Sequence, residues 1–146
     1  QDNEAINVAK VARGIYEAIL SSMVSPGLQL KASFAADQVN LPSNQATSIA
    51  LVLNELLQNS LEHGFEHRNK GTLSVSFRDL TTYYQLKIVD DGCGLPPGFA
   101  LQKTTSLGLK IIQTVVESDL KGKFSLQRGT VQGTVALVRI PGQRES

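Results

Sequence analysis

One segment of the chain places a carboxylate and an amide where they could act on the same ligand. Glu55 and Asn59 stand four residues apart in the apolar-periodic run of residues 51–65, LVLNELLQNSLEHGF. On a helix, with about 100° of rotation per residue, both side chains point the same way from the rim of the buried stripe. Taken singly, a solvated helix carboxylate and a helix-capping amide are the ordinary interpretations of two such residues.

A second segment combines a carboxylate with glycines. Residues 88–96, IVDDGCGLP, run like a strand up to Asp90, and Gly92 and Gly94 follow. Because these glycines have no β-carbon, they let the backbone pass close to a flat ligand where a side chain would collide. Alone, an aspartate-rich turn is more often an ordinary loop. Together, the two segments predict a nucleotide pocket.

Hydrophobic periodicity predicts the elements that must position these segments. Apolar residues at spacings of three and four predict a helix near the N-terminus: Ala5, Val8, Ala12, Ile15 and Ile19. The sequence SPG at residues 25–27 ends this helix, and alternating apolar residues predict a strand over residues 28–34. Residues 40–44, with a proline among them, predict a turn before the helix of residues 51–65.

The rest of the chain is predicted to form two hairpins and a second helix. The first hairpin comprises residues 71–78 and 83–90, the helix residues 108–120, and the second hairpin residues 123–128 and 134–140. This order of elements predicts an α/β sandwich, in which a mixed, mainly antiparallel sheet carries helices on one face.

Composition restricts the class of protein. With 146 residues, the chain fits a single domain that buries roughly 68–70% of the surface exposed in its unfolded state. Lys and Arg number 14 against 13 Asp and Glu, without a basic block, so we expect no nucleic acid and no membrane as a partner. The single cysteine, Cys93, excludes an intramolecular disulfide, and no apolar run of about 20 residues predicts a membrane span. We expect a cytoplasmic protein.

Four landmarks in the sequence resemble those of the GHKL superfamily of ATPases and kinases. Glu55 with Asn59 resembles its N box, and residues 90–94, DDGCG, resemble its first glycine box. Residues 104–116, TTSLGLKIIQTVV, are similar to the second glycine box, and residues 133–141, GTVALVRIP, to the closing Gly-Thr and the last strand. Within the superfamily, the sequence most resembles the catalytic, ATP-binding domain of sensor histidine kinases of the second subfamily.

The resemblance implies a fold and a division of the chain. A sandwich of the Bergerat or GHKL type is expected for the ATP-binding catalytic domain over residues 26–146. Residues 1–25 are expected to be the end of the dimerisation or linker helix that precedes such domains. A terminal helix that covers the core of its own domain fits the same apolar seam equally well.

The resemblance also implies roles for single residues, with ATP and Mg²⁺ as the ligands. Glu55 is expected to act as the general base, and Asn59 to bind Mg²⁺ through its amide oxygen. Asp90 is expected to accept a hydrogen bond from the adenine amino group, which guanine replaces with a carbonyl oxygen, so that ATP is preferred to GTP. The positions expected to contact the nucleotide are Asn59, His63, Asp90, Gly92, Gly94, Lys103, Thr104, Thr105, Ser106, Leu107, Gly108, Leu109 and Thr134.

Residues 95–107 match the loop that closes over the nucleotide in this superfamily, the ATP lid. The loop is short, and we expect it to be mobile without nucleotide. Gly108 would open the helix that follows, whose N-terminal amides and dipole suit phosphate oxygens.

The chain departs from the superfamily pattern at two positions. Glu62 stands where many relatives carry a Lys, so a basic contact to the phosphates is missing there. Lys103, Arg68 or Lys70 would have to replace it. Ser106 stands where a Gly is common, which bears on how closely the backbone approaches the phosphates.

The histidines do not lie where a histidine kinase carries its phosphoacceptor. His63 and His67 both lie outside the predicted N-terminal helix, and a zinc site at this pair would lack a third ligand. We therefore expect a fragment whose partners are the histidine-bearing dimerisation domain of the same kinase and a response regulator. The full-length protein is expected to be a homodimer.

Two other classes of the superfamily stay open as alternatives. A serine kinase of the anti-sigma-factor type would share the pocket and the length of the chain, but it would not need the N-terminal helix. An ATPase module of the gyrase or mismatch-repair type is disfavoured by the short lid and by the lack of a following transducer domain.

Overall fold

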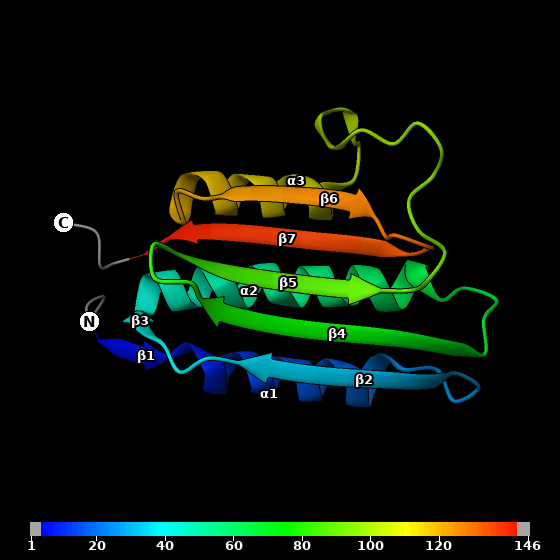
Figure 1. The fold of residues 1–146 in the computed structure, drawn as a ribbon, viewed down its shortest axis with the longest axis horizontal. Coiled ribbons are helices and arrows are strands. Elements are labelled where there is room, and N and C mark those ends of the chain that lie inside the picture. Colours follow the sequence, from blue (N-terminus) through cyan, green and yellow to red (C-terminus); the bar gives the residue numbers. More distant parts are fainter. Residues whose placement is uncertain (1–3, 143–146) are drawn as a thin grey trace.

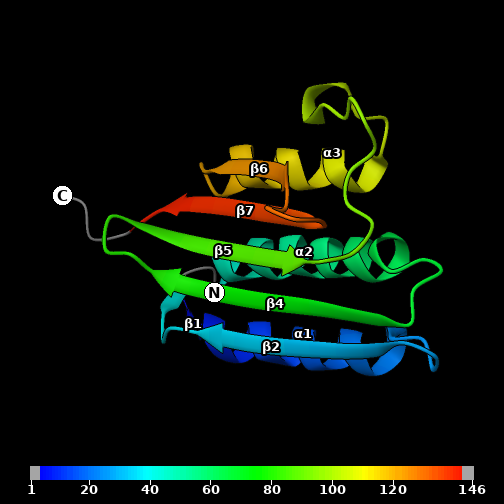
Figure 2. The ribbon, with the colours of Figure 1, turned by 45° about the vertical axis from the view of Figure 1, so that its right-hand side comes forward.

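The computed structural model describes residues 4–142, which form a sheet covered on one face by helices (Figures 1 and 2). The strands of the five-stranded sheet are β2 (Gln29–Ala36), β4 (Lys70–Asp79), β5 (Tyr83–Asp90), β6 (Lys123–Arg128) and β7 (Thr134–Pro141). Their spatial order is β2-β4-β5-β7-β6. β2 pairs with β4 in parallel, and the other neighbours pair antiparallel. The predicted sandwich with a mixed, mainly antiparallel sheet is confirmed.

Three α-helices pack on the same face of the sheet: α1 (Val8–Met23), α2 (Ser43–Asn59) and α3 (Leu107–Thr114). α2 continues into a π-helical turn, η1 (Ser60–Gly64), and α3 into a second one, η3 (Val115–Asp119). A single 3₁₀ turn, η2 (Leu101–Lys103), lies in the loop before α3. The helix predicted over residues 51–65 therefore begins earlier in the chain, and its last turn is widened, as is frequent at functional sites.

A two-stranded sheet corrects two of the predicted elements. β1 (Ala5–Asn7) pairs antiparallel with β3 (Asn40–Pro42), so residues 5–7 are not helical and residues 40–42 are not a turn. The helix begins at Val8 because the side chain of Asn7 accepts a hydrogen bond from the Lys10 amide at 3.1 Å, which caps its N-terminus.

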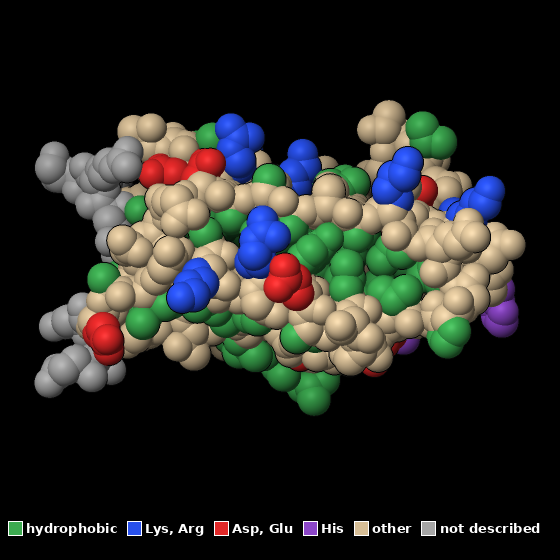
Figure 3. All heavy atoms as spheres, turned by 90° about the horizontal axis from the view of Figure 1, so that it is seen from below, with side chains coloured by type: hydrophobic (Ala, Val, Ile, Leu, Met, Phe, Trp, Pro, Cys, Tyr) green, Lys and Arg blue, Asp and Glu red, His purple; other side chains and the backbone are tan. Residues whose placement is uncertain are grey.

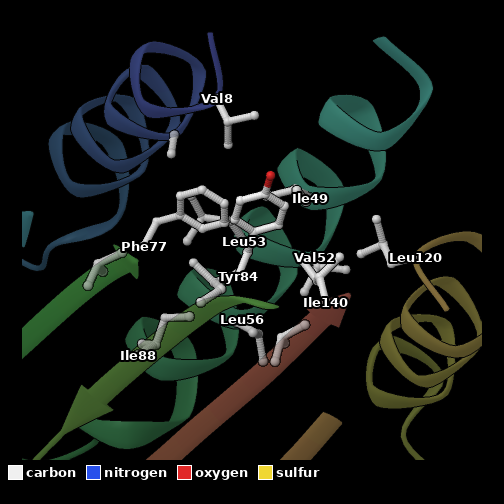
Figure 4. Packing of buried hydrophobic residues seen from close by; sticks show 14 of the residues in the cluster. Val8, Ile49, Val52, Leu53, Leu56, Phe77, Tyr84, Ile88, Leu120 and Ile140 are labelled. Carbon is white, nitrogen blue, oxygen red and sulfur yellow. The ribbon is translucent and has the colours of Figure 1, made fainter. Parts of the chain in front are cut away.

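The core lies between α2 and the inner face of the sheet (Figure 4). The side chains of Leu53 and Phe77 are fully buried there. Three side chains of α1 belong to the same core: Val8, Ala12 and Tyr16. α1 thus covers part of the core of its own domain. This is one of the two roles that the sequence left open for it, the other being the end of a dimerisation helix.

The side of the molecule formed by β2 and α1 is less completely covered (Figure 3). Apolar side chains reach the surface there, and Lys and Arg side chains are spread along this face without joining into a patch. The inward-facing residues of β2 are only partly buried: Leu30, Ala32, Phe34 and Ala36. The Arg13 guanidinium lies 4.8 Å from the centre of the Phe34 ring and covers part of it. Among the described helices, none is both long enough and apolar enough to cross a membrane.

Candidate functional site

A cavity of about 360 Å³ lies between the end of α2, the inner face of the sheet and the loop before α3. Its wall combines apolar, polar and charged side chains with glycine backbone. The lining residues are Leu56, Asn59, Ser60, His63, Gly64, Ile88, Asp90, Gly94, Leu95, Pro96, Phe99, Thr104, Ser106, Leu109, Leu126, Thr134 and Ala136. The predicted residues brought together on this wall are Asn59, His63, Asp90, Gly94, Thr104, Ser106, Leu109 and Thr134.

The pairing register of the sheet builds the floor of the cavity. Asp90 at the end of β5 lies opposite Thr134 at the start of β7. Two residues back along β5, Ile88 lies opposite Ala136, which in turn lies opposite Leu126 of β6. Because residues two apart on a strand share a face, the apolar row and the carboxylate face the same cavity.

Asp90 is a nearly buried carboxylate, 5% exposed. The Ser60 hydroxyl donates a hydrogen bond to its Oδ2 at 3.0 Å, and the Gly92 amide donates one to its Oδ1 at 2.9 Å. Burial raises the pKa of Asp90 above its usual value, and these hydrogen bonds oppose the shift because they favour the charged form. The negative charge of the neighbouring Asp91 raises the same pKa by a smaller amount.

The first glycine segment packs against η1, at the end of the helix that carries Glu55 and Asn59. A β-carbon at Gly92 would lie 2.0 Å from the carbonyl oxygen of Gly64, and the Cys93 amide donates to that oxygen at 2.6 Å. Gly92 is buried behind the cavity wall, whereas Gly94, with a φ of +79°, lies on it. Glycine is therefore required at the two positions for different reasons: close packing at Gly92 and a positive φ at Gly94.

Glu55 lies off the cavity wall and faces the first turn of α3. A β-carbon at Gly108 would lie 3.1 Å from Oε1 of Glu55, so the absence of a side chain at Gly108 lets the carboxylate approach the helix N-terminus. Ser106 caps this helix, since its hydroxyl accepts a hydrogen bond from the Leu109 amide at 3.2 Å. The first-turn amides of Leu107 and Gly108 have no acceptor within the helix and are suited to an anion.

Of the predicted residues in and just after the loop before α3, some lie on the cavity wall and others do not. Thr104 and Ser106 lie on the wall, and the Thr104 hydroxyl accepts a hydrogen bond from the Ser106 amide at 3.1 Å. Lys103, Thr105 and Leu107 are exposed and lie off the wall. Within the described residues, no Lys or Arg lines the cavity. With the loop in this position, none of Lys103, Arg68 and Lys70 therefore supplies the basic contact that Glu62 cannot make.

Two hydrogen bonds fasten this loop to its surroundings. The Arg128 guanidinium at the end of β6 donates to the carbonyl oxygen of Pro96 at 3.0 Å. The Gln113 side chain of α3 donates to the carbonyl oxygen of Leu101 at 3.3 Å. The loop is thus held at its start and near its middle.

Several residues of the wall were not named singly from the sequence, although Leu95, Pro96 and Phe99 belong to the predicted lid of residues 95–107. Ile88 could have been found, because it stands two residues before Asp90 on an alternating strand. Ser60 directly follows Asn59, but its bond to Asp90 joins residues 30 apart and has no local signal. The other additions are Leu56, Gly64, Leu95, Pro96, Phe99, Leu126 and Ala136. Between residues 4 and 142, no three His, Cys, Asp or Glu side chains gather where they could hold a metal ion.

Comparison with known proteins identifies the family. Residues 44–144 match the family described as histidine kinase-, DNA gyrase B- and HSP90-like ATPase. The sensor histidine kinase PdtaS of Mycobacterium tuberculosis is 31% identical over 140 residues, which cover 95% of this chain and 28% of that protein. The chain thus spans less than a third of the length of this relative.

Solved structures agree with this assignment. The histidine kinase domain of the Erythrobacter litoralis EL346 blue-light-activated histidine kinase superposes with a TM-score of 0.87 at 25% identity, covering 97% of this chain and 64% of that one. The nucleotide-free catalytic domain of histidine kinase ThkA has the same fold, with a TM-score of 0.78 at 21% identity over 97% of both chains. The chain therefore belongs to the family of histidine kinase-, DNA gyrase B- and HSP90-like ATPases and is similar to the catalytic domains of sensor histidine kinases.

Proposed function

We propose that this domain binds ATP with Mg²⁺ in the cavity and supplies the γ-phosphoryl group to a histidine on a separate dimerisation domain. The observation that carries the proposal is Asp90, a carboxylate 5% exposed at the wall of a 360 Å³ cavity. Burying a charge without a cationic partner is costly, and no Lys or Arg of the described chain lines this cavity. Such a carboxylate is suited to a ligand that presents a hydrogen-bond donor.

The end of the cavity around Asp90 suits an adenine ring. The carboxylate would accept a hydrogen bond from the exocyclic amino group, and a guanine carbonyl oxygen at that place would face it with repulsion. Ile88, Ala136 and Leu126 offer an apolar surface for the flat ring. We infer that ATP is preferred to GTP for this reason.

The opposite end suits the triphosphate. Asn59 would hold Mg²⁺ through its amide oxygen, and when bound the cation neutralises part of the phosphate charge. The amides of Leu107 and Gly108 at the start of α3 would donate to phosphate oxygens. Of the predicted lid residues, Thr104 and Ser106 would contact the nucleotide directly, whereas Lys103 and Thr105 would do so after the lid moves.

Glu55 would be the general base. Glu55 precedes Ser60 by five positions along the helix, a rise of roughly 7.5 Å, so it acts at the phosphate end while Asp90 acts at the base end. As a nitrogen of the acceptor imidazole attacks the γ-phosphorus, Glu55 takes the proton that the ring gives up, and ADP leaves. Such catalysis contributes typically about 10²–10⁴-fold.

The partners proposed for the full-length protein are those expected from its resemblance to sensor histidine kinases. The histidine would lie on a dimerisation domain of the same kinase in a cytoplasmic homodimer, and an aspartate of a response regulator would receive the phosphoryl group from it. The assignment of residues 1–25 to the end of a dimerisation or linker helix stays a prediction. The second-subfamily assignment is supported by the short lid.

Labelled ATP tests the proposal. Because the transfer needs the nucleophile in line with the phosphorus, this chain alone should remain unlabelled. Adding the helical dimerisation domain from the same full-length protein should produce acid-labile phosphohistidine on that domain. Acid-stable phosphoserine on another protein would support the anti-sigma-factor type of kinase instead, and label on His63 or His67 would contradict a separate acceptor.

A further inference from the structure

We propose that Ser60 is a positioning residue for adenine recognition, holding the Asp90 carboxylate in place through the hydrogen bond from its hydroxyl to Oδ2. Ser60 itself is partly buried and lies on the cavity wall as the first residue of η1. The inference rests on the proposed nucleotide function of the cavity, and it assigns to Ser60 a role that the resemblance did not.

The geometry fixes the plane of the carboxylate from two sides. Oδ2 is bound at 3.0 Å by the Ser60 hydroxyl from the helical side, and Oδ1 at 2.9 Å by the Gly92 amide from the loop side. Rotation of the carboxylate about its terminal torsion would break both bonds. Terminal torsions of this kind are otherwise broad, so without Ser60 only the backbone bonds from Gly92 and Thr134 would hold the carboxylate, and its orientation would be less well fixed. The serine is therefore the side chain that helps to fix where the adenine amino group finds its acceptor.

The same bond acts on the charge of Asp90. Burial disfavours the charged carboxylate, and the hydrogen bonds from the Gly92 amide, the Ser60 hydroxyl and the Thr134 backbone favour it. Among the charged and titratable groups around Asp90, Asp91 at the strand end raises its pKa further, and His63 of η1 lies on the same wall. From β7 and from the lid, the described residues add no charged side chain to the wall. Removing the hydroxyl of Ser60 therefore raises the pKa of Asp90 further and shifts the acid limit of adenine binding to higher pH.

Three variants separate positioning from a general effect on the fold. Ser60→Ala removes the donor, Ser60→Thr retains a hydroxyl, and Ser48→Ala is a matched control on the same helix, partly buried and away from the cavity. The first measurement is the NMR titration of the Asp90 carboxyl carbon in the nucleotide-free protein. The second is the affinity for ATP and for GTP by calorimetry at several pH values.

We expect Ser60→Ala to raise the pKa of Asp90 and to weaken ATP binding by about tenfold or more near neutral pH, with a smaller ATP-to-GTP ratio. Ser60→Thr should restore both, and Ser48→Ala should change neither. If the wild-type protein binds ATP and Ser60→Ala leaves the titration and the ratio unchanged, the inference is wrong while the proposed function stands. If the wild-type protein binds no ATP, the proposed function is wrong, and the titration alone still decides whether Ser60 holds Asp90.

Discussion

The carboxylate of Glu55 faces Gly108 across the narrow space between α2 and the first turn of α3. A β-carbon on Gly108 would lie 3.1 Å from Oε1 of Glu55, closer than ordinary van der Waals contact. The glycine at this position therefore leaves room for the Glu55 carboxylate beside the first turn of α3. The Glu55 carboxylate and the N-terminus of α3 can lie side by side because Gly108 places no side chain between them.

Glu55→Gln should retain nucleotide binding and lose phosphoryl transfer by about 10²–10⁴-fold, because the amide cannot take up the proton. Transfer to the added dimerisation domain and ATP affinity by calorimetry measure the two effects separately. A parallel fall in binding and transfer would show that Glu55 has a structural role instead.

Gly108→Ala should displace the Glu55 carboxylate by a few tenths of an ångström and reduce transfer by roughly tenfold, since small misplacements of a catalytic group are costly. ATP affinity should change less than the transfer rate. Unaltered transfer in this variant would mean that the position of Glu55 relative to α3 is not important for the reaction.

Asp90→Asn should keep the fold and lose the preference for adenine. An amide can accept from the Gly92 amide and donate to the Ser60 hydroxyl, so both hydrogen bonds survive in the variant. It presents a donor where the carboxylate presents an acceptor, so ATP affinity should fall at least about tenfold and GTP should be discriminated less. Calorimetry with both nucleotides measures the change.

The same variant should change how stability depends on pH. The pKa of Asp90 is raised in the folded state above its usual 3.8, so the folded protein binds more protons than the unfolded chain between these two values. The free energy of unfolding of the wild-type protein therefore decreases as pH rises from about 3.8 through the raised pKa. Asp90→Asn should lack this decrease, so thermal unfolding across that window should show the variant gaining stability relative to the wild type.

The places of Asn59 and Asp90 on the cavity wall were predictable from the sequence, because both residues follow a regular period. Glu55 and Asn59 share a helix face and Asp90 ends an alternating strand, and both patterns are local. Ser106 also had a local signal, because serine directly before a helix is a typical N-cap.

Contacts between distant segments were not predictable in this way. The packing of Gly92 on Gly64 depends on how the end of a helix meets the end of a strand. The pairing of β1 with β3 involves strands of three residues each, which are too short to show a period.

Gly92→Ala should destabilise the domain by about 1–3 kcal/mol, because its β-carbon would overlap the carbonyl oxygen of Gly64. The matched control is Gly14→Ala on the exposed side of α1, where a β-carbon meets nothing within 4 Å. There, alanine should stabilise the helix by roughly 0.5–1 kcal/mol. Urea unfolding of both variants tests the pair, and equal stabilities would contradict the close packing.

Ala12→Asp should unfold the domain or cost several kcal/mol, because Ala12 is 2% exposed within the shared core and an aspartate there would be buried without a partner. Ala18→Asp, on the exposed side of the same helix, should stay within about 0.5 kcal/mol of the wild type. Circular dichroism during urea titration distinguishes the two. Similar stability of both variants would mean that α1 is not required by the core.

The parallel pairing of β2 with β4 has a consequence for the order in which the chain folds. The antiparallel neighbours β4 and β5, and likewise β6 and β7, are consecutive strands that can pair as soon as their short connections close. β2 reaches its place beside β4 only after the whole of α2 has crossed over, and loop closure of that length slows assembly. As an edge strand with a partly exposed inner face, β2 also opens at a lower cost than the central strands. The N-terminal third of the domain should therefore dock last, and its amides should exchange with solvent before those of β5 and β7.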